Sequence, residues 1–229
     1  MGSKERLSNL NKLGLMLDRY NKEPQNASFI SETWGAVFDY WSDSAKSTGL
    51  VVPDIKVEPL NVPLSSLNET TFDSEGFSVP TTMIFYPPEL RGKDGLILMG
   101  KMFPQLGTRT VRDNTPLQSE NDFTGWLNVE AVFEAPNVNT TEHQLREHFN
   151  SIERIGMSEN QYIIFSLFTK LVFGRYVDYS VLCRLLDSRL ENYVINARFG
   201  TLGDLHVNSH LRPSLRGEEL GGRSIKVIQ

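Results

Sequence analysis

The chain has a single cysteine, Cys183, among its 229 residues. A lone thiol excludes an intrachain disulfide framework, and it excludes zinc or iron–sulfur sites built mainly from cysteine. The sequence also lacks the glycine-rich loops that hold nucleotide phosphates and the Gly-x-Ser-x-Gly turn of many hydrolases. We therefore expect no cofactor and no catalytic residue, and we interpret Cys183 as a packed or helix-surface thiol.

Long apolar runs are also lacking. The longest, residues 162–173, is about two-thirds of the length needed to cross a membrane, and it contains Lys170. The apolar run near the start, residues 13–17, is too short for a secretory signal. We expect an intracellular protein of the cytoplasm or nucleus, or of the virus particle if the chain is viral. Peripheral contact with a membrane stays open.

Positive charge is scarce, since 23 basic side chains face 28 acidic ones and the net charge is −5. A nucleic-acid surface needs clustered positive charge, and only the last third of the chain is a candidate for it. Its candidate phosphate contacts are Arg175, Arg184, Arg189 and Arg198. Asp187 and Glu191 lie among them, so any binding should be weak, non-specific and strongly salt-dependent.

Leucines at helical spacing predict an amphipathic helix over residues 4–21. Leu7, Leu10 and Leu17 belong to this stripe, and we take them as candidate self-association residues. Because a helix of this length is marginal alone, it needs a surface to pack on. That surface is either another copy of the chain or the helix's own domain. A second helix is expected to begin at Ser28 or Ser31 and to stop near Gly49.

Four prolines then mark residues 50–80 as a connection, because each removes a backbone donor and restricts its predecessor. The sequence thus predicts an N-terminal helical region over 1–49, a proline-rich connection over 50–80, and an α+β domain over 81–229. Strands are expected at 81–86, 96–103 and 126–133. Helices are expected from Thr140 as N-cap, from Ser158, and over 178–199, and the tail from Arg212 is expected to be mobile.

The predicted fold class is therefore α+β, with N-terminal helices, a small mixed or antiparallel sheet, and a helical C-terminal third. His206 and His210 stand four residues apart, a spacing that places two metal ligands on one helix face. The glycines and the proline around them disfavour a helix there. Because a pair without a third ligand rarely binds a metal, we expect no metal site.

One segment resembles the first strand and helix of an RNA recognition motif. The resemblance covers Val132 to Asn137, Thr141-Glu142 and Leu145 to Phe149. The family's aromatic RNP1 strand is missing downstream, where residues 158–199 are expected to be helical. Base stacking would then lack its usual platform.

A wider window, Trp126 to Phe173, is similar to the matrix proteins of rhabdoviruses. The shared pattern is a strand at 129–133, a turn at Pro136-Asn137, a helix at 145–152, a polar turn at 156–160 and an apolar helix at 162–173. The Pro-Pro-x-Tyr motif and the basic N-terminal arm of that family are absent. The resemblance implies a structural protein of the virion.

The leading hypothesis is a non-enzymatic structural or assembly protein, of the viral matrix type that the resemblance implies, that acts through self-association and protein–protein contacts. It predicts a homo-oligomer or a complex with a protein partner. Two alternatives stay open. One is an RNA-binding module that uses the C-terminal arginines, and the other is an enzyme whose site residues are scattered beyond any local motif.

Overall fold

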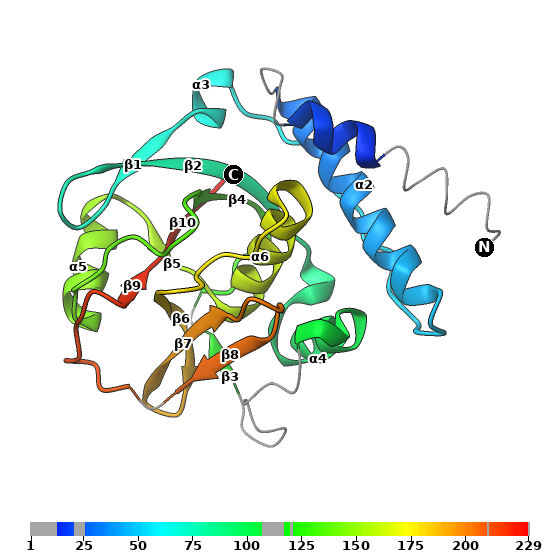
Figure 1. Cartoon of the computed structure of the whole chain (residues 1–229). Helices are drawn as coiled ribbons and strands as arrows, with labels where there is room; N and C mark the ends of the chain where they lie inside the picture. Colours follow the sequence, from blue (N-terminus) through cyan, green and yellow to red (C-terminus); the bar gives the residue numbers. More distant parts are fainter. Residues whose placement is uncertain (1–12, 21–25, 107–116, 120, 210, 229) are drawn as a thin grey trace.

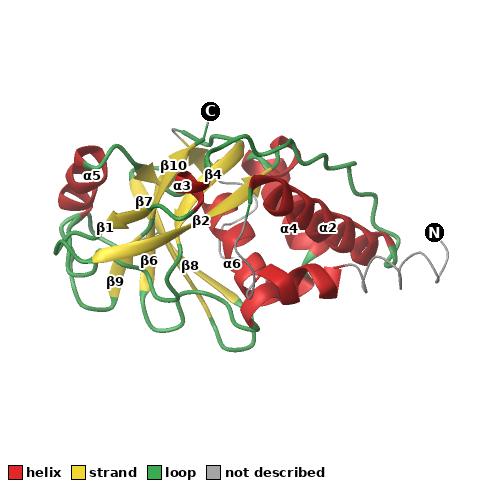
Figure 2. Ribbon diagram, turned by 90° about the horizontal axis from the view of Figure 1, so that it is seen from above, coloured by secondary structure: helices red, strands yellow, loops and turns green. Residues whose placement is uncertain are grey.

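The chain has an α+β fold, as the sequence predicts. The computed structural model describes residues 13–20, 26–106, 117–119, 121–209 and 211–228. Two sheets share one end of the molecule, and helices α2, α4 and α6 gather at the other (Figure 2). Helix α5 lies apart from them, at the far side of the strands (Figure 1).

Three of the helices begin at a residue whose side chain caps them. Beyond a helical segment at residues 13–20, they are α2 (Ala27–Lys46), α3 (Leu64–Leu67), η1 (Pro88–Leu90), α4 (Gly92–Met102), η2 (Pro104–Leu106), α5 (Glu142–Ser151) and α6 (Glu159–Phe173). Ser158 caps α6 with a capping box, as expected. The cap of α5 is Thr141 rather than the predicted Thr140, and Gln144 completes its capping box. Gly174, at φ 75°, ends α6 in the left-handed conformation.

The first sheet has the order β1-β2-β4-β10-β5, and every pair in it is antiparallel. Its strands are β1 (Thr70–Phe72), β2 (Ser78–Tyr86), β4 (Gly125–Glu130), β5 (Ile155–Gly156) and β10 (Ser224–Val227). Strand β4 lies between β2 and β10, with Thr82 opposite Val129 and Ile225 opposite the same residue. The predicted strands at 81–86 and 126–133 correspond to β2 and β4.

The second sheet has the order β3-β6-β7-β8, and β9 adds to β6 in parallel. Its strands are β3 (Leu117–Ser119), β6 (Leu182–Leu190), β7 (Tyr193–Phe199), β8 (Leu205–Asn208) and β9 (Leu220–Gly222). The two sheets therefore combine antiparallel and mixed pairing, where the sequence predicted one small sheet of either kind.

The predicted helical C-terminal third is wrong beyond α6. Residues 178–199, expected as a helix, form the β6–β7 hairpin instead. Most of β6 is buried, so its apolar residues do not alternate with polar ones and also fit a helical spacing. Its two-residue turn is Glu191-Asn192, and Glu191 has φ 55°, a left-handed conformation that glycine or asparagine usually adopts.

The predicted strand at 96–103 is also wrong, because residues 92–102 form helix α4. Leu96, Met99 and Met102 recur every three residues and bury one face of that helix. The run is short and nearly all apolar, so its periodicity could not separate a strand from a helix. Gly95 packs against the Leu90 main chain, in a space that a Cβ would fill.

The end of the tail predicted to be mobile is built into the core, since β9 and β10 lie there and Arg223 is fully buried between them, whereas residues 212–216 are exposed. A single cluster of buried apolar side chains includes Leu13, Leu60 and Ile225. It thus draws on all three predicted segments of the chain. Residues 50–80 contain α3, β1 and the start of β2, and the domain boundaries stay a prediction.

Candidate functional site

Two of the four candidate phosphate-binding arginines form hydrogen bonds within the protein. Arg184 lies in β6, is only 2% exposed, and donates hydrogen bonds to the carbonyl oxygens of Thr140 and Leu215. Arg189 donates from Nη2 to Oε1 of Glu142 at 2.8 Å. Each guanidinium therefore links its strand to a segment that is distant in sequence.

The other two arginines lie elsewhere. Arg198 is exposed on β7, opposite His206 of β8. Arg175 follows α6 and pairs with Glu134, with Nη2 and Oε1 3.3 Å apart. Because Arg184 is buried, the four do not form the exposed cluster that phosphate binding needs. Nucleic-acid binding through them stays untested.

The predicted self-association stripe lies only partly within the described residues. Leu7 and Leu10 fall outside them. Leu17 is partly buried against the chain's own core, beside the buried Leu13 and Met16. The described half of the stripe thus packs on its own domain, the alternative left open above.

Cys183 is buried in β6, where burial raises the pKa of its thiol well above the usual range. His206 contacts Asp204 at 2.5 Å, and His210 lies outside the described residues. Where the structure is described, no three His, Cys, Asp or Glu side chains are grouped to hold a metal ion.

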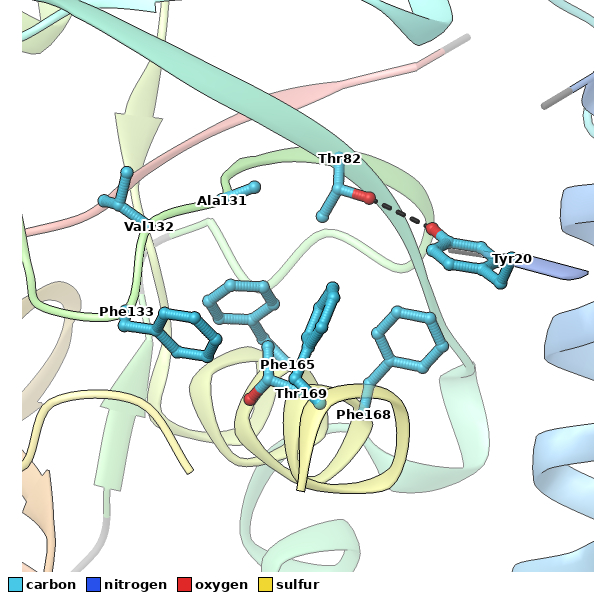
Figure 3. Close-up of a pocket in the computed structure, with 9 residues that line it drawn as sticks. Tyr20, Thr82, Ala131, Val132, Phe133, Phe165, Phe168 and Thr169 are labelled. Carbon is cyan, nitrogen blue, oxygen red and sulfur yellow. Dashed lines mark hydrogen bonds between the residues drawn. The ribbon is translucent and has the colours of Figure 1, made fainter. Parts of the chain in front are cut away.

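The most distinctive hollow is an aromatic pocket between the helical segment 13–20, strand β2 and helix α6 (Figure 3). We call it the aromatic pocket; its lining residues are Tyr20, Thr82, Ala131, Val132, Phe133, Phe165, Phe168, Thr169 and Phe173. Five of these nine side chains are aromatic, and none carries a charge. The pocket encloses about 110 Å³. Its chemistry selects an apolar group.

Helix α6 builds the pocket's floor because Phe165, Thr169 and Phe173 follow one another at intervals of four. Residues at this spacing share one face of a helix. Phe165 and Thr169 are buried, whereas Phe173 is 52% exposed and stands at the rim. The floor and one side of the mouth thus come from a single rigid element.

Buried contacts hold the floor in place. The Phe168 ring stacks on Trp34 of α2, with centroids 4.4 Å apart. The Tyr20 ring meets Phe168 edge-on, and its hydroxyl lies 3.1 Å from Oγ1 of Thr82. Beneath the floor, the guanidinium of Arg223 lies 5.3 Å from the centre of the Phe165 ring. The pocket is therefore preformed.

The rim combines exposed aromatic rings with a cation. Phe133 meets Phe173 edge-on, with centroids 5.8 Å apart. Arg175 lies 4.1 Å from the centre of the Phe133 ring and 5.1 Å from that of Tyr179. Arg175 donates one described hydrogen bond, from Nη2 to Glu134, although a guanidinium has five N–H donors. The mouth can therefore accept a negative group beside an apolar one.

Two larger hollows have less distinctive chemistry. One of about 440 Å³ lies beside the C-terminal ends of α2, α4 and α6, and Lys101 and Lys170 line it. Lysines in the last turn complement the negative end of a helix dipole, and Lys170 donates to the Gly174 carbonyl oxygen. Another, of about 510 Å³, is lined by Arg146 and Arg189, which both form ion pairs with Glu142.

Sequence reasoning did not single out Phe133 or Phe173. The signal for Phe173 was present, because Phe165 and Phe173 are eight residues apart in an apolar helix and so share one face. Phe133 had no such signal, since it was expected inside a strand. In the structure β4 ends at Glu130, and Phe133 lies in the loop that follows.

Comparison with models of protein families, with curated proteins and with solved structures finds no match for this chain. The elements between residues 125 and 173 are β4, α5, the two-residue strand β5 and α6. The resemblance to rhabdovirus matrix proteins stays a prediction. Within the described residues, no helix is both long and apolar enough to span a membrane.

Proposed function

We propose that this chain is a non-enzymatic structural or assembly protein that self-associates by accepting an apolar side chain in the aromatic pocket. The observation that carries the proposal is the preformed, uncharged pocket with two phenylalanines exposed at its mouth, Phe133 and Phe173. Aromatic side chains and arginine are enriched in protein–protein interfaces.

The size of the pocket supports a protein ligand. Small-molecule and cofactor sites usually measure about 300–1,000 Å³. The aromatic pocket, at about 110 Å³, is closer to a cavity that holds one benzene ring. One bulky side chain of a partner fits this volume better than a cofactor does. The partner's remaining contacts would then lie outside the pocket.

Two further observations, one from the sequence and one from the structure, support the same proposal. The resemblance of residues 126–173 to rhabdovirus matrix proteins implies a structural role in a virion. The RNA-binding alternative is weaker because Arg184 and Arg189 are engaged inside the protein. We therefore rank self-association first.

The test compares two exposed phenylalanines. Phe173→Asp places a charge at the pocket mouth, whereas Phe123→Asp makes the same change at Phe123, which does not line the pocket. Molar mass is measured by light scattering after size exclusion, over a range of concentrations. We expect the wild type to exceed the 26.0 kDa of one chain, Phe173→Asp to be monomeric, and Phe123→Asp to match the wild type. A monomeric wild type, or an unchanged mass for Phe173→Asp, would overturn the proposal.

A further inference from the structure

The turn between β1 and β2 carries the features that the aromatic pocket selects. We call residues 72–77 the β1–β2 tip. Phe77, at 65% exposed, is the most exposed aromatic side chain of the described residues, and Phe72 is also exposed. Glu75, between them, is exposed as well. Such bulky apolar groups on a surface mark sites of association.

The tip is held in a fixed conformation. Oδ1 of Asp73 accepts hydrogen bonds from the main-chain N–H groups of Glu75 and Phe77, at 3.0 and 2.8 Å. Gly76 has φ 87°, which the turn requires. Oδ1 of Asn137 accepts a further bond from the Ser74 N–H. Because the turn is already ordered, binding through it would cost little conformational entropy.

We propose that the β1–β2 tip of one copy docks in the aromatic pocket of a second copy, with Phe77 inside the pocket and Glu75 against Arg175. This inference rests on the proposed function and names the ligand of that pocket. The ring of Phe77 has the size and polarity that an uncharged pocket of about 110 Å³ accepts. The carboxylate of Glu75 would share the Arg175 guanidinium with Glu134, which accepts a hydrogen bond from Nη2 alone.

The tip and the pocket are separate patches of one chain, connected by the loop that carries both Phe133 and Asn137. Phe77 is exposed, so it does not fill the pocket of its own chain. Each docked copy therefore still offers one unused tip or pocket. Such a contact either closes on itself by symmetry or extends into a chain of copies.

A charge exchange tests the pairing of Glu75 with Arg175. We expect Glu75→Lys and Arg175→Glu each to weaken self-association by roughly tenfold or more, because like charges would then meet. The double variant Glu75→Lys/Arg175→Glu should recover most of the wild-type affinity. Glu89→Lys, an exposed charge reversal elsewhere, is the control and should leave affinity unchanged. Recovery in the double variant cannot come from misfolding. Its absence contradicts the pairing when urea denaturation shows that Arg175→Glu, which also removes the partner of Glu134, is still folded.

A mixing experiment tests the docking itself. Phe77→Ser removes the aromatic ring of the tip and keeps the pocket. Phe173→Asp places a charge at the pocket mouth and keeps the tip. Each should be monomeric alone, and an equimolar mixture should form dimers through its one intact tip and one intact pocket. If Phe77→Ser keeps the wild-type mass while Phe173→Asp is monomeric, the tip is not the ligand and the proposed function survives. If both keep the wild-type mass, the two proposals fail together.

Discussion

Arg223 and Asp178 form an ion pair in which neither side chain reaches solvent. Two parallel hydrogen bonds join them, from Nη2 to Oδ1 at 2.7 Å and from Nε to Oδ2 at 3.2 Å. Nη1 of Arg223 donates to the Glu130 carbonyl oxygen. The same guanidinium lies under the Phe165 ring, so this pair connects the chain's last strands to the floor of the aromatic pocket.

Removing the charge of Asp178 should destabilise the fold strongly. Asp178→Asn leaves the Arg223 guanidinium buried without its counter-charge. Breaking one side of a buried ion pair costs about 3–5 kcal/mol. Urea denaturation should show a loss of this size in the free energy of unfolding. Asp204→Asn removes one member of a partly exposed pair with His206 and should cost less than about 1 kcal/mol. Equal losses in both variants would contradict the role given to the buried pair.

Glu130 should make stability depend on pH. Burial raises the pKa of its carboxyl above the ordinary 4.5, although the Ser224 N–H, Arg154 and Arg223 act in the opposite direction. The folded state therefore favours the protonated carboxyl. Its stabilising contribution is complete below about pH 4.5 and is lost as pH rises through the raised folded-state pKa.

The variant Glu130→Gln stays neutral at every pH, so it should escape this loss. Relative to the wild type, its free energy of unfolding should increase between pH 5 and pH 8, because only the wild type loses stability over this range. Urea denaturation of both proteins at the two pH values measures the change. A difference between the proteins that is the same at both pH values would show that Glu130 does not titrate this way.

The sequence predicts those elements whose boundaries are set by local chemistry. Helix α6 is an example, because the Ser158 cap and Gly174 mark its two ends. Prediction from the sequence fails where both faces of an element are buried, as in β6, or where an apolar run is short, as in α4. The candidate arginines illustrate a further limit. Whether Arg184 meets a phosphate or two carbonyl oxygens depends on loops that the sequence does not place.

Cys183 should be inert while the chain is folded. The thiolate is the reactive form, and burial both raises the pKa of this thiol and blocks reagents. We expect a thiol-specific colorimetric reagent to modify the native protein no faster than the protein unfolds. In concentrated urea the same single thiol should react at the rate of free cysteine. Fast modification under native conditions would place Cys183 at the surface.

Arg184 and Arg198 separate a structural role from a phosphate-binding one. Arg184→Gln deprives the carbonyl oxygens of Thr140 and Leu215 of their donors, which should cost about 2–3 kcal/mol of unfolding free energy. Arg198→Gln changes an exposed side chain and should cost less than about 0.5 kcal/mol. Urea denaturation gives both values. Binding of each variant to a single-stranded oligonucleotide at low salt shows whether either arginine also contacts phosphate.

Two leucines in the first described helical segment decide whether that segment belongs to the core. Leu13 is 2% exposed, whereas Leu15, two residues away, is 70% exposed. Leu13→Ala should lower the free energy of unfolding by about 2–5 kcal/mol, because it removes buried methyl groups and leaves a cavity. Leu15→Ala should change it by less than about 0.5 kcal/mol. Urea denaturation and light scattering are measured on both variants. If Leu13→Ala lowered only the oligomer mass and left stability unchanged, the segment would serve association rather than its own domain. Because Leu13 packs in the same cluster as Phe168, we expect the loss of stability instead.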